Sequence, residues 1–371
     1  MSIPTIEISG DPHTRGTQYG EQTREAVATA IGYYTESLGK ATGLTWAQIR
    51  DKARRWLEPA REFAPELVEE MDGIAAGAGV HPGDILVLNV RGEASYDPTF
   101  RDVPDGCTSF AMTTASGDGH VYCGQNWDWR DGVRDTVVLL RIVQPPKPTV
   151  VMHVEAGQVG RQGANSAGIG LNANGLGGRF DATMGVPQTL IRRKALDCAS
   201  LSDALDVLVR TRGHIASNAL LTHRDRFAID VETTPGACGW MYPDDGLLVH
   251  GNHFQAFVPP QLAAEHRPFS PDSLIRVPRA TEGLRRCADA TDPAEVRKRI
   301  RTALSDHLGY PDSLCAHPDP AREPVRRWAT LLSSCVDLTA GEYRVTPGNP
   351  CANEYQLAPW NLYDGPGEVR P

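Results

Sequence analysis

The chain changes character at Cys107, and this change constrains the fold more than any other feature of the sequence. Residues before it are mainly helical in pattern, with apolar side chains at helical spacing in 16–38, 45–57 and 65–76. From Cys107 onward, alternating apolar and polar residues predict strands, interrupted by groups of helices. Runs of strands separated by helical pairs favour sheets stacked on each other with helices outside. The sequence therefore predicts an α+β fold.

The elements expected along the chain support this order. Turn residues Ser116-Gly117-Asp118-Gly119 predict a hairpin between strands at 110–114 and 120–129. Thr45 is a predicted helix cap, and Ser202 is predicted to cap a helix over 201–212. The other expected elements are strands at 5–9, 136–143, 149–155, 168–172, 219–222, 227–231, 239–242 and 247–250, a strand or helix at 84–90, helices at 187–199, 279–287 and 293–307, a Pro-rich surface excursion at 259–278, and a hairpin of 329–337 with 343–345.

Charge and cysteine usage exclude several classes of function. The formal net charge of −9 argues against nucleic acid or an anionic membrane as partner, since both need clustered Lys and Arg. A small-molecule substrate is therefore expected, and the start of the sequence, without a signal-peptide pattern, predicts a cytoplasmic protein. The eight cysteines contain no C-x-x-C pair, so we expect free thiols, no bound metal, no disulfide framework and no cofactor.

The bond between Gly106 and Cys107 is a candidate site of self-cleavage. Glycine tolerates strained backbone angles and leaves its carbonyl open to attack by the next side chain. After cleavage, Cys107 would carry a thiol and a free α-amino group with an ordinary pKa of about 7.7 to 8.0. That amine can take the thiol proton near neutral pH, so one residue supplies nucleophile and base. The alternative is that Cys107 is a small buried hydrophobe at a turn-to-strand junction.

Two further residues are candidates for the same site. Asp128 lies on the strand that would pair with the strand of Cys107, so its carboxylate can reach the new amine. Asn252 ends a predicted strand and could donate its amide to an oxyanion. The alternatives are a surface carboxylate and a turn asparagine. His250 and His253 suggest a metal only weakly, because no third ligand stands at a recognisable spacing.

Four motifs in this order carry a family resemblance: Asp105-Gly106-Cys107-Thr108-Ser109, Gln125-Asn126-Trp127-Asp128, Asn165-Ser166-Ala167-Gly168 and Asn252-His253. Together they resemble the acyl-coenzyme A:6-aminopenicillanic acid acyltransferase family, also called peptidase family C45, among the N-terminal nucleophile (Ntn) hydrolases. The resemblance implies a four-layer αββα sandwich. It also implies a helical N-terminal segment, 1–106, and a catalytic segment, 107–371, which form one domain.

The resemblance also implies roles for single residues. Cys107 would be the nucleophile, Asp128 the partner of its amine and Asn252 the oxyanion donor, with Asp105 and Gly106 forming the cleavage motif. Ser313 is similar to a serine of a family Ser-x-Cys segment, and further candidates for the site are His253, Asn126 and Asn172. The sequence departs from the family at Ala316-His317, where the penicillin-forming relative has an arginine, and this puts a penicillin substrate in doubt.

The leading hypothesis is a self-cleaving enzyme that acts on a small N-acylated amine through a thioester on Cys107. Hydrolysis is favoured over transfer because water is always available, and acyl-coenzyme A is a second candidate partner. The alternative is an uncleaved, noncatalytic small-molecule binding protein on the same fold. A papain-like protease is disfavoured, because the local sequence around Cys107 lacks that signature.

Overall fold

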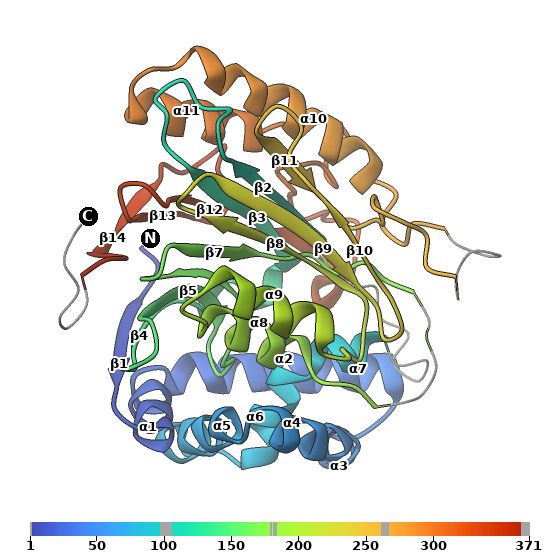
Figure 1. Ribbon diagram of the computed structural model, residues 1–371. Helices are drawn as coiled ribbons and strands as arrows, with labels where there is room; N and C mark the ends of the chain where they lie inside the picture. Colours follow the sequence, from blue (N-terminus) through green and yellow to red (C-terminus); the bar gives the residue numbers. More distant parts are fainter. Residues whose placement is uncertain (1, 97–105, 179, 181–183, 261–266, 365–371) are drawn as a thin grey trace.

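Two β-sheets lie against each other, with helices on their outer sides (Figure 1). The computed structural model describes residues 2–96, 106–178, 180, 184–260 and 267–364. Asp105, part of the predicted cleavage motif, lies outside the described residues. Among those that are described, no helix combines the length and apolar character needed to cross a bilayer.

The first sheet has eight strands, and all neighbours are antiparallel except β1 and β4. In spatial order they are β1 (Thr5–Ser9), β4 (Val137–Val143), β5 (Val150–Glu155), β6 (Gln162–Asn165), β7 (Ile169–Asn172), β8 (Ser217–His223), β9 (Phe227–Thr233) and β10 (Cys238–Met241).

The second sheet has six antiparallel strands and holds Cys107. In spatial order they are β11 (Leu247–His250), β2 (Gly106–Met112), β3 (Tyr122–Arg130), β12 (Trp328–Asp337), β13 (Glu342–Pro347) and β14 (Gln356–Asn361). Every residue of β3 is buried, because one face of this strand meets the first sheet and the other meets the helices above it.

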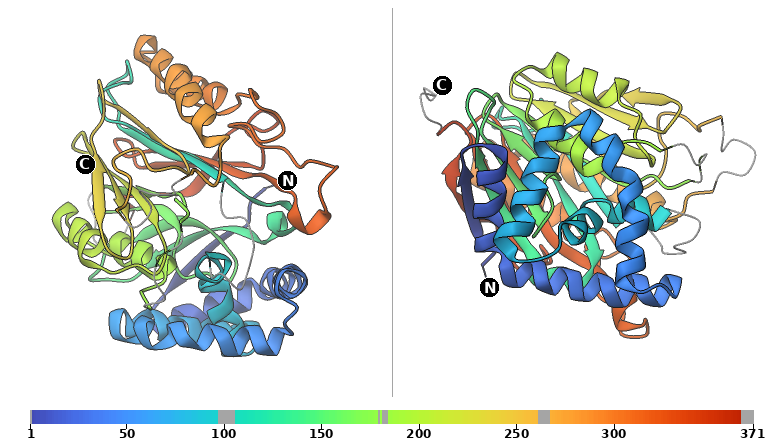
Figure 2. Two further views of the ribbon diagram at one scale, coloured as in Figure 1. Left: turned by 90° about the vertical axis from the view of Figure 1, so that its right-hand side faces the viewer. Right: turned by 90° about the horizontal axis from the view of Figure 1, so that it is seen from below.

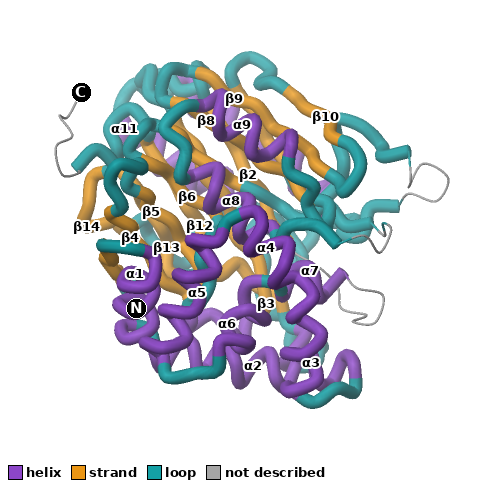
Figure 3. Tube along the Cα trace, turned by 60° about the horizontal axis from the view of Figure 1, so that its bottom comes forward, coloured by secondary structure: helices purple, strands orange, loops and turns teal. Residues whose placement is uncertain are grey.

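Helices cover both outer faces (Figures 1 and 2). α10 (Ser273–Arg285) and α11 (Pro293–Leu304) lie on the second sheet, and α8 (Gln188–Leu196) and α9 (Leu201–Arg210) on the first. The N-terminal helices form a further group below the first sheet in Figure 1, and Figure 3 shows them with this lower side turned forward. They are α1 (Pro12–Gln22), α2 (Arg24–Thr42), α3 (Trp46–Ala53), α4 (Leu57–Phe63), α5 (Pro65–Ala78), α6 (Pro82–Asn89) and α7 (Arg91–Tyr96).

Glycines let α1 and α5 approach unusually closely. A Cβ at Gly16 would lie 2.1 Å from the carbonyl oxygen of Glu70, and one at Gly73 would lie 2.3 Å from that of His13. Any side chain at these positions would therefore push the two helices apart. This pairing fixes the geometry of the N-terminal helices.

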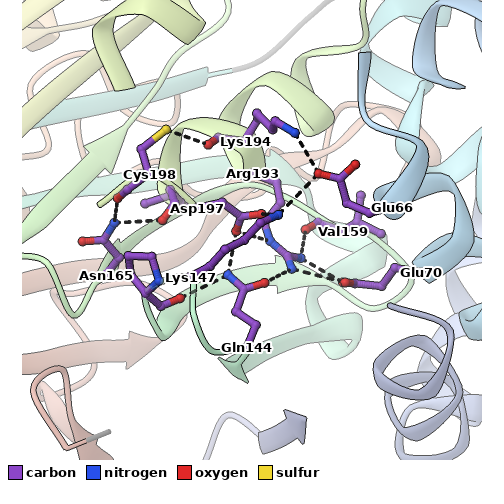
Figure 4. Close-up of polar contacts among 12 residues, drawn as sticks. Glu66, Glu70, Gln144, Lys147, Val159, Asn165, Arg193, Lys194, Asp197 and Cys198 are labelled. Carbon is purple, nitrogen blue, oxygen red and sulfur yellow. Dashed lines mark hydrogen bonds and ion pairs between the residues drawn. The ribbon is translucent and has the colours of Figure 1, made fainter. Parts of the chain in front are cut away.

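Buried ion pairs join these helices to the rest of the molecule (Figure 4). The guanidinium of Arg193 on α8 bonds Glu70 of α5 and Asp197, each at 2.8 Å, and Glu70 also pairs with Arg15 of α1. Burial alone would raise the pKa of Asp197, but the Arg193 guanidinium holds that pKa below its usual range. Because an uncompensated buried charge is very costly, this network makes the N-terminal helices an integral part of the fold.

Polar contacts also connect the two sheets near Cys107. Gln125 of β3 accepts a hydrogen bond from the backbone N–H of Ala173 (3.1 Å), and Asn174 donates to the hydroxyl of Ser109 on β2 (3.0 Å). His250 of β11 is 2.9 Å from the carboxylate of Glu232 on β9. Strand β2, which carries Cys107, is thus linked by hydrogen bonds to the first sheet as well as to its own.

The structure corrects several sequence expectations. The side chain of Ser200, not Ser202, caps α9, because the helix begins at Leu201. The predicted surface excursion ends early, since α10 begins at Ser273 and contains Pro278, which the sequence analysis placed outside any helix. Residues 84–90, expected as either a strand or a helix, belong mostly to helix α6, which agrees with the second alternative, and strand β14 was not predicted.

Candidate active site

Cys107 lies at the start of β2, between β11 and β3, and its side chain is completely buried. The hairpin register places Gly106 opposite Asp128 and Cys107 opposite Trp127. The Sγ atom of Cys107 is 4.0 Å from the backbone oxygen of Asp128. The sequence prediction that the hairpin partner brings Asp128 beside Cys107 is confirmed.

Asn252 meets the backbone nitrogen of Cys107. The N–H of Cys107 donates to Oδ1 of Asn252 at 2.7 Å, and the same oxygen accepts from Arg276 at 2.8 Å. Nδ2 of Asn252 donates to the carbonyl of Gly175 at 2.9 Å. Two donors on one side and a carbonyl on the other define which end of the amide is oxygen. Asn252 therefore contacts the atom that cleavage would turn into the α-amine, and it does so as an acceptor.

Arg276 completes this arrangement, and the sequence analysis missed it. Its guanidinium donates to the carbonyl oxygen of Cys107 (2.6 Å) and to the hydroxyl of Thr108 (2.7 Å), while Nε pairs with Asp272 (2.7 Å). Burial would raise the pKa of Asp272, but Arg276 and hydrogen bonds hold it below its usual range. The four-residue spacing of Asp272 and Arg276 is the one available signal, and it required recognising a helix across Pro278.

The carboxylate of Asp128 lies beside the predicted cleavage bond. A Cβ built on Gly106 would be 3.3 Å from Cβ and 3.6 Å from Oδ2 of Asp128. Thr330 of β12 donates to Oδ1 of Asp128 at 2.6 Å. Glycine at position 106 provides space beside this carboxylate.

A cavity of about 610 Å³ opens at this point, and both Gly106 and Asp128 line it. Its wall combines charged and aromatic groups, among them Arg130, Arg322, Asp312, Phe269 and Trp328. Such a cavity has the size and mixed polarity of a small-molecule site. The end of β2 that carries the predicted cleavage bond therefore faces a ligand-sized space.

Comparison with known proteins shows the family of the chain. The family model described as acyl-coenzyme A:6-aminopenicillanic acid acyl-transferase matches residues 114–351. The 40 kDa form of acyl-coenzyme A:6-aminopenicillanic-acid-acyltransferase from Emericella nidulans is 30% identical over 346 residues, which cover 93% of this chain and 92% of the relative. The chain belongs to this acyltransferase family. It is accordingly an enzyme.

Solved structures of distant proteins are also similar to the chain. A conjugated bile acid hydrolase variant from Clostridium perfringens aligns with a TM-score of 0.42 and 13% identity, over 69% of this chain and 97% of that one. Penicillin V acylase from Agrobacterium tumefaciens aligns with a TM-score of 0.39 and 16% identity, over 65% of this chain and 83% of that one.

The secondary candidates carried over from the acyltransferase family lie in different surroundings. Ser313 lines the cavity, is buried and donates to the carbonyl of Cys315 (2.7 Å). Asn126 donates to the carbonyls of Leu304 and Leu314, so it fixes the chain next to Ser313. Ser313 thus forms part of the cavity wall, and Asn126 anchors the segment that carries it.

The other two candidates are less directly connected to Cys107. Asn172 is buried at the end of β7 and is not part of the cavity lining. Nδ1 of His253 is 2.7 Å from the hydroxyl of Ser273 at the start of α10, whereas His250 faces Glu232. The two histidines thus have separate partners, which removes the weak suggestion that they share a metal.

Proposed function

We propose that the chain cleaves its own backbone between Gly106 and Cys107 and that Cys107 then serves as an N-terminal nucleophile. The observation that carries the proposal is the hydrogen bond from the Cys107 nitrogen to Asn252, directly after Gly106, which lines the cavity together with Asp128. We assign the stacked sheets with their outer helices to the four-layer αββα class of Ntn hydrolases, with 1–106 and 107–371 as the two parts of one domain.

Self-cleavage begins with attack of the Cys107 sulfur on the carbonyl carbon of Gly106. The Gly106–Cys107 amide bond breaks as a thioester forms, and the nitrogen gains a proton. Water then hydrolyses that thioester, which leaves a carboxylate on Gly106 and a free thiol and α-amine on Cys107. Arg276 already holds the carbonyl of Cys107, and Asn252 its nitrogen, so the new terminus is positioned before the bond is cut.

In turnover, the Cys107 α-amine takes the thiol proton and the sulfur attacks the acyl carbonyl of a small N-acylated amine. The amine of the substrate leaves with a proton, and an acyl thioester remains on Cys107. Attack by water releases the acid and restores the thiol. Attack by a second amine would instead transfer the acyl group. We favour hydrolysis, with acyl-coenzyme A, named in the Emericella relative, as the alternative acyl donor.

The carboxylate of Asp128 is suited to hold the freed amine in this scheme. It lies next to Gly106 and is fixed by the hydroxyl of Thr330, so it can accept a charge-assisted hydrogen bond from the ammonium form. Asn252 would accept a second bond from the same nitrogen. One N–H of the Asn252 amide is committed to Gly175, and the other is the group that would serve an oxyanion.

Trapping the acyl-enzyme tests the proposal. Cleaved protein is mixed with N-acylated amines and, separately, with acyl-coenzyme A thioesters, quenched in acid and analysed by intact mass and peptide mapping. We expect an acyl adduct on Cys107 that hydroxylamine removes. Cys107→Ala should form none, while Cys238→Ser, which changes a cysteine on β10 outside the site, should behave as wild type. Turnover by Cys107→Ala at the wild-type rate would contradict the proposal.

A further inference from the structure

Four side chains that the proposed reaction does not use point their metal-binding atoms at one another. His307 follows α11, Cys315 and His317 lie in the segment before β12, and Cys351 lies between β13 and β14. Their ligand atoms all lie within 4.8 Å of one another. The wide sequence spacing explains why no zinc pattern was visible, since Cys351 joins the group only through the fold.

The distances within this cluster match a tetrahedral zinc site. Zinc binds thiolate sulfur at about 2.3 Å and imidazole nitrogen at about 2.0 to 2.1 Å, so tetrahedral ligands lie about 3.8 Å (S to S), about 3.6 Å (S to N) and about 3.3 Å (N to N) apart. The Sγ atoms of Cys315 and Cys351 are 3.6 Å apart. Nε2 of His317 lies 3.7 Å and 3.6 Å from these two sulfurs and 3.1 Å from Nε2 of His307.

Neighbouring side chains hold the candidate ligands in place, as is usual around a metal site. Nδ2 of Asn349 donates to the Sγ atom of Cys315 (3.4 Å) and to the carbonyl of Ala316 (2.7 Å). The ring of Tyr310 packs against both imidazoles, with centroids 6.4 Å from His307 and 5.4 Å from His317. Donors to a ligand sulfur and rings packed on ligand histidines fix the first coordination sphere.

We propose that His307, Cys315, His317 and Cys351 bind one zinc ion. Four protein ligands leave no open position for water or substrate, so the ion would be structural. Two thiolates also balance the charge of Zn²⁺, which suits a site where Cys315 is buried. The ion would join the segment 307–317 to the β13–β14 connection. That segment carries Ser313 and Ala316, which line the cavity beside Asp128.

A disulfide between Cys315 and Cys351 is the competing use of the two thiols. It would require the sulfurs to close from 3.6 Å to about 2.05 Å. It would also give no reason for both histidine Nε2 atoms to face the same point. The zinc site explains all four side chains together.

Metal analysis of untagged protein, purified in the presence of a phosphine reductant and without chelators, tests the site. We expect about one zinc ion per chain by inductively coupled plasma mass spectrometry. Replacement by Co²⁺ should give the intense visible absorption of tetrahedral Co²⁺ with thiolate ligands. Cys351→Ser and His307→Ala alter residues near the surface and should lower bound zinc at least tenfold.

Matched controls separate this site from other thiols. Cys238→Ser and Cys107→Ala should retain the metal, and a chelator should lower the melting temperature of wild type but not of Cys351→Ser. The proposal is overturned if wild type holds no stoichiometric zinc even after incubation with the ion. It is equally overturned by full zinc retention in both cluster variants, or by a mass about 2 Da lower from a Cys315–Cys351 disulfide in the reduced preparation. None of these results depends on self-cleavage or activity.

Discussion

Replacing Asn252 by aspartate distinguishes two roles for this side chain. In the structure its Oδ1 accepts from the nitrogen of Cys107 at 2.7 Å and from Arg276 at 2.8 Å. Asn252→Asp keeps an acceptor oxygen there but adds a negative charge and removes both amide hydrogens. If Asn252 acts by holding the amine, the variant should work once that amine is neutral. If it acts by donating to an oxyanion, the variant should fail at every pH.

The expected size of each effect follows from the contacts. A carboxylate this close to an amine favours the ammonium form, so the acid limb of the kcat/KM profile should move upward by about one to two pH units. This shift is smaller than an unpaired carboxylate would cause, because Arg276 pairs with the same oxygen. Asn252→Ala loses the acceptor altogether. A hydrogen bond to a charged group is worth about 1.5 to 3 kcal/mol, so kcat/KM should fall about tenfold to a hundredfold.

The assay measures kcat/KM from pH 6 to about pH 10 on the cleaved fraction of each variant, quantified by intact mass because the substitution can also slow processing. We expect Asn252→Asp to regain most of the wild-type rate at alkaline pH. A loss of about a hundredfold to a thousandfold in kcat that is the same at all pH values would refute this reasoning and support the oxyanion role.

Two further substitutions test other parts of the account. Asp128→Asn should lower kcat/KM about tenfold to a hundredfold while the protein stays folded, because the amide removes the charge that holds the freed amine but keeps an oxygen that can accept from Thr330; wild-type kinetics in a folded, cleaved variant would remove Asp128 from the mechanism. Arg193→Met, made in the uncleaved Cys107→Ala background and followed by urea unfolding, should lower the free energy of unfolding by about 3 kcal/mol, the lower end of the range for breaking a buried ion pair, since Arg15 still pairs with Glu70 and Lys147 with Asp197. Because Arg193 holds the folded-state pKa of Asp197 below the ordinary value of 3.8, that stabilisation is present above about pH 4 and lost as the pH falls further. The difference between the two proteins should therefore shrink in acid, and a difference independent of pH would contradict the assignment.

The local elements were readable from the sequence where a capping or turn residue marks them. Thr45 caps α3 through Gln48, Asp292 caps α11, and Gly117 lies in the turn between β2 and β3, all as expected. Asp128 could be placed beside Cys107 because a hairpin sets the register of its two strands. These predictions depend on contacts close along the chain.

What could not be predicted depends on contacts between distant segments. Arg276 reaches Cys107 only because α10 packs on β2, and no local pattern reports that. The meeting of Cys351 with His307 likewise follows from the placement of the β13–β14 connection near the end of α11. Asn252 was a candidate from the sequence, but the direction of its amide is set by Gly175 and Arg276, which lie on other segments of the chain.

Intact-mass spectrometry of the purified wild-type protein under denaturing conditions tests the central claim most directly. The account predicts two fragments, one that ends at Gly106 and one that begins at Cys107, and a single uncut chain for Cys107→Ala. An intact wild-type chain after prolonged incubation at neutral pH, or cleavage of Cys107→Ala at the same bond, would contradict it.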